Sequence, residues 1–311
     1  MQEKLKSVID LSVKIGKLQL ANPILTASGT FGHGEEFSPF LDLNKLGGIV
    51  TKAVTLEPRP GNPAPRIAET AAGMLNSIGL ANVGVDRFIK EKLPFLQTLE
   101  TPVFVNVAGK LITDFSMVIE KIETAGGVAG YELNISCPNV KEGGMAFGTD
   151  ARVTAQITSL TRRVTSKCLL VKLTPNVTSI ADIAKAAENE GADGLSVINT
   201  LVGMAVDIQS KKPKLATICG GLSGPAIKPI ALAKVYEVVN AVKLPVIGIG
   251  GIMNINDVLE FLITGATAIQ VGTANFITPT ISEQLIFDLE NYCKKNGIHS
   301  IKEIINSLRI S

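Results

Sequence analysis

Two lysines and three asparagines stand within or directly after apolar segments, where a side chain can reach a ligand. Lys52 and Lys172 lie in the runs VTKAV and VKLTP. A buried ammonium group is costly unless it meets an anion or other acceptors, so this pair predicts an anionic ligand. Asn106, Asn134 and Asn199 end similar runs. Their carboxamides both donate and accept hydrogen bonds, which suits a flat ligand with alternating polar edge atoms.

Glycines follow two further apolar segments late in the chain. Gly250 and Gly251 lie in IGIGGIMNINDV, and Gly272 and Thr273 lie in IQVGTANF. Glycine lets backbone N–H groups approach an anion closely, and a following helix adds a favourable dipole. The two stretches together favour a phosphate site, although each alone would also fit a tight turn.

Cys137, in NISCPN, stands between a serine and a proline after an apolar run. The other cysteines, Cys168, Cys219 and Cys293, lie far from it and from one another. This spacing predicts no metal site, and in a cytoplasmic protein a disulfide is disfavoured. Its position among polar residues at a strand end disfavours an inert core thiol. A covalent nucleophile and a proton-abstracting base both stay open.

The elements that must position these residues form an alternating pattern. Short β-branched runs bounded by Gly or Pro are typical of strands buried on both faces of a parallel sheet. Helix-period segments intervene, for example 114–125, 179–191 (capped by Ser179 or Thr178) and 254–266. Eight strands and no GxGxxG fingerprint predict an α/β fold of the (β/α)8 barrel type, with its chemistry at the carboxyl ends of the strands. The predicted strands are 23–28, 47–54, 102–109, 131–138, 169–175, 194–200, 245–252 and 268–274.

Two segments fall outside the barrel pattern. Residues 11–23 alternate around Gly16 and Lys17 and predict a hairpin across the amino-terminal end of the barrel. Residues 55–82 are rich in Pro and predict a long irregular loop insertion on the substrate side. No linker or repeat interrupts the chain, so a single domain over 1–311 is expected.

The composition excludes several classes of protein. A net charge of +2 in 311 residues, no Trp and three Tyr give no basic groove or stacking platform for nucleic acid. No apolar run approaches the roughly 18 residues that a membrane-spanning helix needs. The first residues lack the apolar centre of a signal peptide, so a cytoplasmic protein without membrane association is expected.

The ordered motifs resemble those of one family, the flavin-dependent dihydroorotate dehydrogenases of pyrimidine (UMP) biosynthesis. The resemblance spans roughly residues 11–280. It rests on NPILTASGTFG (22–32), VTKAVTLEPRPGNPAPR (50–66), MLNSIGLANVG (74–84), ELNISCPN (132–139), VKLTPN (171–176), INTLVGMAVD (198–207), GGLSGPAIKP (220–229), IGIGGI (247–252) and QVGTANF (270–276).

The resemblance implies that dihydroorotate is oxidised to orotate. Cys137 would remove the C5 proton, FMN would accept the C6 hydride, and Lys172 would face the flavin. The implied substrate-binding residues are Lys52, Asn76, Ser77, Ile78, Gly79, Leu80, Asn134, Asn139, Asn199 and Thr200. The implied FMN-binding residues are Ser28, Lys52, Ala53, Asn106, Asn134, Lys172, Ile198, Gly224, Gly250, Gly251, Gly272 and Thr273.

The same resemblance bears on the electron acceptor. A cysteine at position 137 and the stretches INTLVGMAVDI and KLTPNVT look like the NAD-linked class, called 1B. That class implies a partner subunit with FAD and a [2Fe–2S] cluster, two chains of each kind forming a heterotetramer. The nearest alternatives are the homodimeric, fumarate-linked class 1A and a related FMN-dependent dihydropyrimidine dehydrogenase. A Schiff-base aldolase using Lys172 and a non-catalytic flavin- or nucleotide-binding barrel are more distant ones.

Overall fold

A closed barrel of eight parallel strands forms the centre of the molecule. The structure, a computed structural model, describes residues 9–135, 141–142 and 145–310. The strands follow the order β11-β12-β17-β18-β3-β4-β7-β8 around the barrel. Each predicted strand overlaps one of them, so the predicted (β/α)8 fold is confirmed. Their bounds are β3 (Ile24–Thr26), β4 (Gly48–Val50), β7 (Val103–Val107), β8 (Gly130–Asn134), β11 (Cys168–Leu173), β12 (Gly194–Val197), β17 (Val246–Ile249) and β18 (Ala268–Val271).

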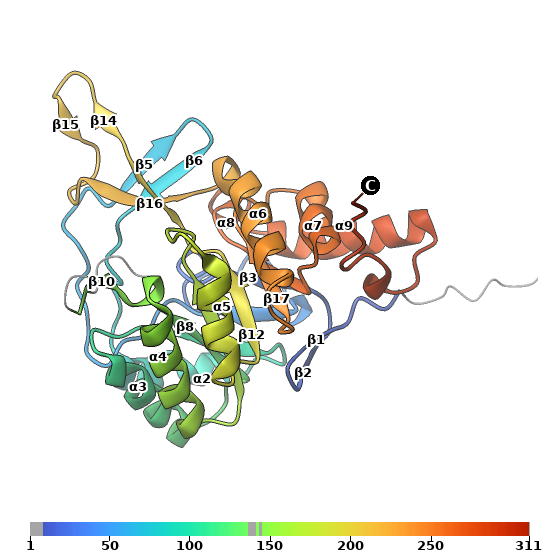
Figure 1. The fold of residues 1–311 in the computed structure, drawn as a ribbon, viewed down its shortest axis with the longest axis horizontal. Helices are drawn as coiled ribbons and strands as arrows, with labels where there is room; N and C mark the ends of the chain where they lie inside the picture. The colour runs from blue at the N-terminus through green and yellow to red at the C-terminus, as the bar shows by residue number, and fades with distance from the viewer. Residues whose placement is uncertain (1–8, 136–140, 143–144, 311) are drawn as a thin grey trace, which may run out of the picture.

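Helices cover the outside of the barrel (Figure 1). The predicted helices at 114–125, 179–191 and 254–266 correspond to α3, α5 and α7, and Ser179 rather than Thr178 caps α5 through the N–H of Asp182. The α-helices are α1 (Val85–Glu91), α2 (Leu93–Leu96), α3 (Ile112–Ala125), α4 (Ala151–Val164), α5 (Ile180–Asn189), α6 (Lys228–Val239), α7 (Ile255–Thr264), α8 (Ala274–Ile277) and α9 (Ile281–Asn296). Short 3-10 turns lie at Leu43–Lys45, Phe147–Thr149, Pro225–Ile227 and Ile301–Glu303.

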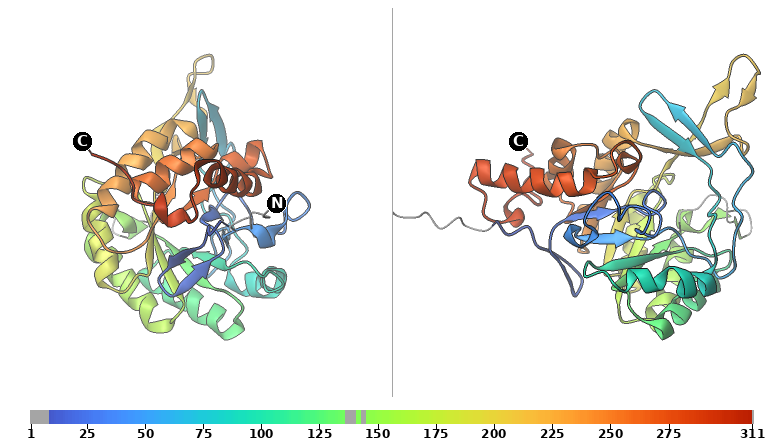
Figure 2. Two further views of the ribbon diagram at one scale, coloured as in Figure 1. Left: turned by 90° about the vertical axis from the view of Figure 1, so that its right-hand side faces the viewer. Right: turned by 180° about the vertical axis from the view of Figure 1, so that it is seen from behind.

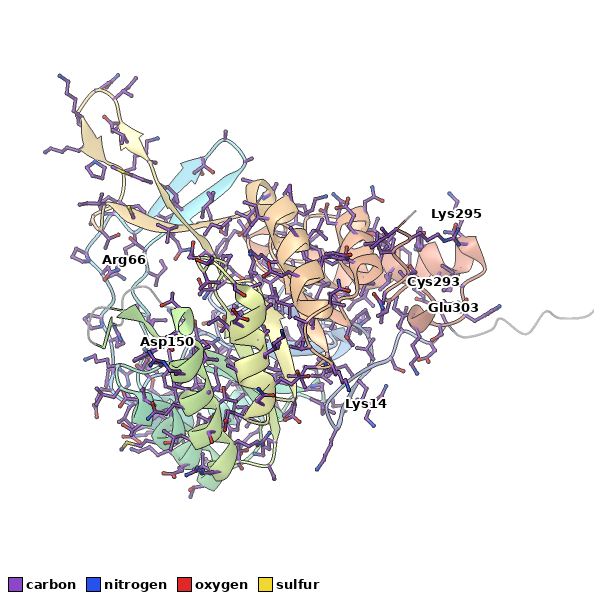
Figure 3. The ribbon with its side chains drawn as sticks, in the orientation of Figure 1. Lys14, Arg66, Asp150, Cys293, Lys295 and Glu303 are labelled. Carbon is purple, nitrogen blue, oxygen red and sulfur yellow. The ribbon has the colours of Figure 1, made fainter. Side chains whose placement is uncertain are left out.

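The amino-terminal hairpin closes one end of the barrel, as its sequence predicts. Strands β1 (Val13–Ile15) and β2 (Leu18–Leu20) pair around the turn at Gly16. The side chain of Ile15 is fully buried, and its carbonyl oxygen accepts a hydrogen bond from Sγ of Cys168, the first residue of β11, at 3.8 Å. Lys14 of this hairpin and Arg66 of the insertion lie on different sides of the barrel (Figure 3).

A four-stranded antiparallel sheet stands at the other end. The prediction of an irregular loop over 55–82 is wrong in part, because this segment contains the hairpin β5 (Ile67–Thr70) and β6 (Gly73–Asn76). The hairpin pairs with β16 (Cys219–Ser223), which pairs with β13 (Leu201–Met204), giving the order β13-β16-β6-β5. Local patterns missed the sheet because its two halves are more than 120 residues apart and each strand is only four or five residues long.

This sheet and a further small hairpin project from the same side of the barrel (Figure 2). The hairpin consists of β14 (Val206–Asp207) and β15 (Lys212–Pro213). Another pair, β9 (Lys141–Glu142) and β10 (Met145–Ala146), follows β8. Within the described ranges, no helix has both the length and the apolar character needed to cross a membrane.

Candidate active site

One cavity of about 620 Å³ lies at the carboxyl ends of the barrel strands, beneath the four-stranded sheet. A cavity of this size suits a small-molecule ligand. Every predicted site residue in the described chain lines it, whereas Cys137 and Asn139 lie outside the described residues. The predicted residues in its wall are Ser28, Lys52, Ala53, Asn76, Ser77, Ile78, Gly79, Leu80, Asn106, Asn134, Lys172, Ile198, Asn199, Thr200, Gly224, Gly250, Gly251, Gly272 and Thr273.

Lys172 forms an ion pair inside the protein. This changes the prediction that both buried lysines need an anionic ligand. Its Nζ lies 3.4 Å from Oε1 of Glu132 and donates to the Ser28 hydroxyl at 3.1 Å. Glu132 has no exposed surface and the Lys172 side chain is 5% exposed, so the ion pair is shielded from water. The positive charge of Lys172 therefore has a counterion in the protein and does not by itself require an anionic ligand.

Lys52 lacks such a counterion. It lies two residues after the end of β4, lines the cavity and is half-buried. Across the described residues, no carboxylate lies within ion-pair distance of its Nζ. Of the two lysines, Lys52 is therefore the one that is expected to bind an anionic ligand.

Glu132 is the residue beside the cavity that sequence reasoning missed. Its Oε1 accepts from Nδ2 of Asn106 at 2.7 Å, and its Oε2 accepts from Ser196 Oγ at 2.7 Å and Gln270 Nε2 at 2.8 Å. Burial opposes ionisation, but the charge of Lys172 and these three donors outweigh it and hold the pKa of Glu132 below its usual value. A carboxylate two residues before Asn134 in an apolar strand was the available signal, because alternate strand residues share a face.

The asparagine side chains form a hydrogen-bonded row along the cavity wall. Nδ2 of Asn134 donates to Oδ1 of Asn106 at 3.3 Å, and Nδ2 of Asn199 donates to Oδ1 of Asn134 at 3.3 Å. The row ends where the N–H of Thr200 donates to Oδ1 of Asn199 at 2.8 Å. These side chains come from β7, β8 and the segment after β12, which the barrel brings together at its carboxyl end.

The two glycine-containing turns meet at one corner of the cavity. Gly251 has φ +74°, and a Cβ there would lie 2.8 Å from Cβ of Lys228, so the backbone itself requires glycine. Gly272 differs, because its φ is ordinary and its Cβ would only touch Ala27 at 3.6 Å and Thr30 at 3.9 Å. In the described structure, the N–H groups of Gly251, Gly272 and Thr273 donate to no protein atom. This corner offers backbone donors to an anion.

The overlying sheet completes the cavity. Asn76 of β6 donates through Nδ2 to the carbonyl oxygen of Gly221 in β16 at 3.3 Å, which joins the two halves of the sheet. The hydroxyl of Ser77, the next residue, is buried in the cavity wall and has no hydrogen-bond partner within the described chain. Such an orphaned hydroxyl fits a site that a polar ligand fills. Cys219, unremarkable in sequence, is exposed at the same cavity.

Comparisons with known proteins agree with this architecture. A crystal structure of dihydroorotate dehydrogenase from Eimeria tenella, in complex with ferulenol, superimposes with a TM-score of 0.80. It covers 99% of this chain and 91% of that chain at 22% sequence identity, which supports the fold alone.

Sequence relatives are much closer. The chain is 56% identical over 301 residues to the catalytic subunit of dihydroorotate dehydrogenase B (NAD(+)) of Geotalea daltonii, covering 97% of this chain and 99% of that protein. The protein of the same name from Bacteroides thetaiotaomicron is 52% identical over the same shares of the two chains. The family model described as dihydroorotate dehydrogenase matches residues 10–292. Residues 10–292 carry the barrel and the cavity described above, and on this match the chain belongs to the dihydroorotate dehydrogenase family.

Proposed function

We propose that the chain is the FMN-containing catalytic subunit of an NAD-linked dihydroorotate dehydrogenase, which oxidises dihydroorotate to orotate in the synthesis of UMP. The observation that carries the proposal is the cavity itself. It gathers an ion-paired Lys172, a row of amides, and, as far as the described residues go, a Lys52 without a carboxylate partner and a corner of open backbone N–H groups. The names of relatives that are 52% to 56% identical over nearly the whole chain support the same activity.

The residues present fit FMN. Gly272 has room for a Cβ that neither its backbone nor its neighbours forbid, so an occupant of the cavity accounts for glycine there. The phosphate of FMN would take the N–H groups of Gly250, Gly251, Gly272 and Thr273. Ser28, Ala53, Asn106, Lys172, Ile198 and Gly224 would hold the rest of the cofactor. When bound, FMN accepts the hydride that leaves C6 of dihydroorotate.

The remaining polar groups bind and orient dihydroorotate. Lys52 pairs with its carboxylate, since this lysine has no protein counterion in the described chain. Asn134 and Asn199 hold the amide edge of the ring, and Ser77 and its neighbours in the 76–80 loop close over it. The overlying sheet excludes water, which strengthens these polar contacts. Asn139 and Thr200 complete the proposed substrate shell.

Cys137 is proposed as the base that removes the proton from C5. Loss of this proton and of the C6 hydride leaves the C5–C6 double bond of orotate, so atoms and electrons balance. The assignment rests on the family motif ELNISCPN, because Cys137 lies outside the described residues. Asn134, three residues earlier in the sequence, ends β8.

A partner subunit would carry the electrons onward. Relatives of this chain are named as catalytic subunits, which supports a second kind of subunit. We propose that it holds FAD and a [2Fe–2S] cluster, that NAD is the final acceptor, and that two chains of each kind assemble. The fumarate-linked class 1A and a dihydropyrimidine dehydrogenase are less favoured, because the relatives named above carry the NAD-linked name.

The ion pair of Lys172 argues against an aldolase on the same barrel. An amine held as the ammonium partner of Glu132 lacks the free electron pair that Schiff-base formation needs.

An acceptor panel tests the proposed function. Purified chain with FMN is mixed with dihydroorotate and, in turn, NAD, fumarate or a quinone, with and without the candidate partner subunit. Orotate is measured by its absorbance. We expect NAD reduction only with the partner present. Rapid turnover with fumarate by the chain alone would move it to class 1A, and absence of orotate with every acceptor would refute the activity.

A further inference from the structure

Glu132 lies beneath the cavity and does not line it, yet it contacts the cavity wall from below. The cavity-lining side chains of Lys172 and Asn106 reach its Oε1, at 3.4 Å and 2.7 Å. Ser196 and Gln270 donate to its Oε2, at 2.7 Å and 2.8 Å. These four donors come from β7, β11, β12 and β18, so one carboxylate ties together four strands of the barrel besides its own. Both of its oxygens are used, which fixes its rotation.

An ionised carboxylate can only accept hydrogen bonds, and this constrains the amides around it. Asn106 must turn its NH2 group toward Glu132, so its Oδ1 points the other way. Gln270 makes the same adjustment: its Nε2 faces Glu132, while its buried Oε1 has no partner within the described chain. The carboxylate of Glu132 thus receives its hydrogen bonds, whereas the side-chain carbonyl of Gln270 stays unpaired among the described residues.

The orientation of Asn106 is passed along the cavity wall. Because Oδ1 of Asn106 is available only as an acceptor, Asn134 must donate to it, and Asn199 must in turn donate to Asn134. The N–H of Thr200 ends the row as a donor to Asn199. Each amide therefore has one allowed orientation, and the two ends of the row, the Glu132 carboxylate and the Thr200 N–H, both require it.

We propose that Glu132 is a positioning residue that fixes Lys172 and the direction of the amide row, and thereby the pattern of donors and acceptors that the cavity presents to flavin and substrate. The proposal rests on the function proposed above. A glutamine at position 132 could donate as well as accept, so Asn106 could face it with either end. Only the Thr200 N–H, at the far end of the row, would still require the present direction, so Asn106 would be held less firmly, and Lys172 would lose its counterion.

The experiment measures binding and not turnover. FMN is removed, and its dissociation constant is determined by the quenching of flavin fluorescence on rebinding; the dissociation constant of orotate is determined from the change in the flavin spectrum. Glu132→Gln is expected to weaken both by about tenfold or more, as for lost hydrogen bonds to a charged group. Glu123→Gln is the matched control, because Glu123 also accepts two side-chain hydrogen bonds and pairs with a lysine, Lys167, away from the cavity. The control should bind FMN within twofold of the unmodified protein.

A second substitution is designed to restore the hydrogen-bond direction of the amide row while residue 132 stays glutamine. In Glu132→Gln/Asn106→Asp the new carboxylate at position 106 can only accept, so Asn134 must again donate to it. It also lies near Lys172, because Asn106 Nδ2 and Lys172 Nζ both reach the Ser28 hydroxyl, at 3.2 Å and 3.1 Å. We expect the double variant to regain most of the lost affinity. A purely structural role for Glu132 predicts no such rescue.

The outcomes separate the two proposals. Failure of the unmodified protein to bind FMN would refute the proposed function. If it binds FMN, then unchanged affinity in Glu132→Gln, equal loss in Glu123→Gln, or no rescue in the double variant would each overturn the role of Glu132. Should Glu132→Gln fail to fold, Ser196→Ala removes one of the two donors to Oε2 while keeping the charge and should weaken FMN binding several-fold; unchanged affinity there would also overturn the proposal.

Discussion

Substitution of Gly272 by alanine should separate cofactor binding from folding. Gly272 directly follows β18 and has a backbone conformation that alanine adopts without strain. The added Cβ would meet only Cβ of Ala27 at 3.6 Å and Oγ1 of Thr30 at 3.9 Å, both ordinary contacts in the cavity wall. The free energy of unfolding of the FMN-free protein should therefore stay constant or rise by up to about 1 kcal/mol, since alanine reduces the entropy of the unfolded chain.

Cofactor binding should respond in the opposite way. A methyl group beside the open N–H groups of Gly272 and Thr273 would keep a phosphate oxygen from hydrogen-bond distance. Loss of two charge-assisted hydrogen bonds at about 1.5–3 kcal/mol each predicts an FMN dissociation constant at least about 100-fold higher. Fluorescence titration measures this affinity, and urea unfolding of the FMN-free protein measures stability.

Gly251→Ala is the contrasting variant. Its φ of +74° and a Cβ 2.8 Å from Cβ of Lys228 predict lower stability whether or not FMN binds. Normal FMN affinity in Gly272→Ala would refute the phosphate site at this corner. A large loss of stability in Gly272→Ala would refute the claim that the protein leaves room for the Cβ.

Three further predictions concern other parts of the chain. Lys172→Met leaves the buried carboxylate of Glu132 uncompensated and should lower the free energy of unfolding by about 3 kcal/mol, with weaker FMN retention; urea unfolding that matches the unmodified protein would contradict the ion pair. Cys137→Ala should still bind FMN and orotate while oxidation slows by roughly 100-fold or more in stopped-flow measurements, as expected for loss of a general base, and an unchanged rate would remove Cys137 from the mechanism. Burial lowers the pKa of His33 to about 4, so the folded protein keeps His33 neutral while the unfolded chain binds a proton below pH 6.5. Stability should thus fall by up to roughly 3 kcal/mol between pH 6.5 and 4, and His33→Gln should flatten this part of the urea-unfolding profile.

Much of the architecture could be predicted because it depends on local patterns. Short continuous apolar runs and helix-period segments specify the strands and helices, and capping residues such as Ser179 locate helix ends within one or two residues. Because the strands of the barrel are parallel, the polar residues at their carboxyl ends are predicted to lie on one face of it. The roles of individual site residues stay predictions, although Lys52, Asn134 and Gly272 do share one cavity.

Contacts between distant segments could not be predicted in the same way. The hairpin β5–β6 gains its partner strands only when β13 and β16 fold over it, and a short strand pair is marginal in isolation. From the sequence alone, Lys172 is predicted to need an anionic ligand, because its counterion Glu132 lies 40 residues earlier in the chain.

The sequence by itself determined the barrel, the polar strand ends and the family, because these follow from residue types at fixed local spacing. Only the tertiary structure decided which lysine has an internal counterion, which way the amide row runs and that a Cβ at Gly272 would have room. These properties depend on distances of a few ångströms between strands that the closed barrel brings together. Closure of the barrel converts Glu132, an inconspicuous charge in an apolar strand, into the acceptor around which the cavity wall is organised.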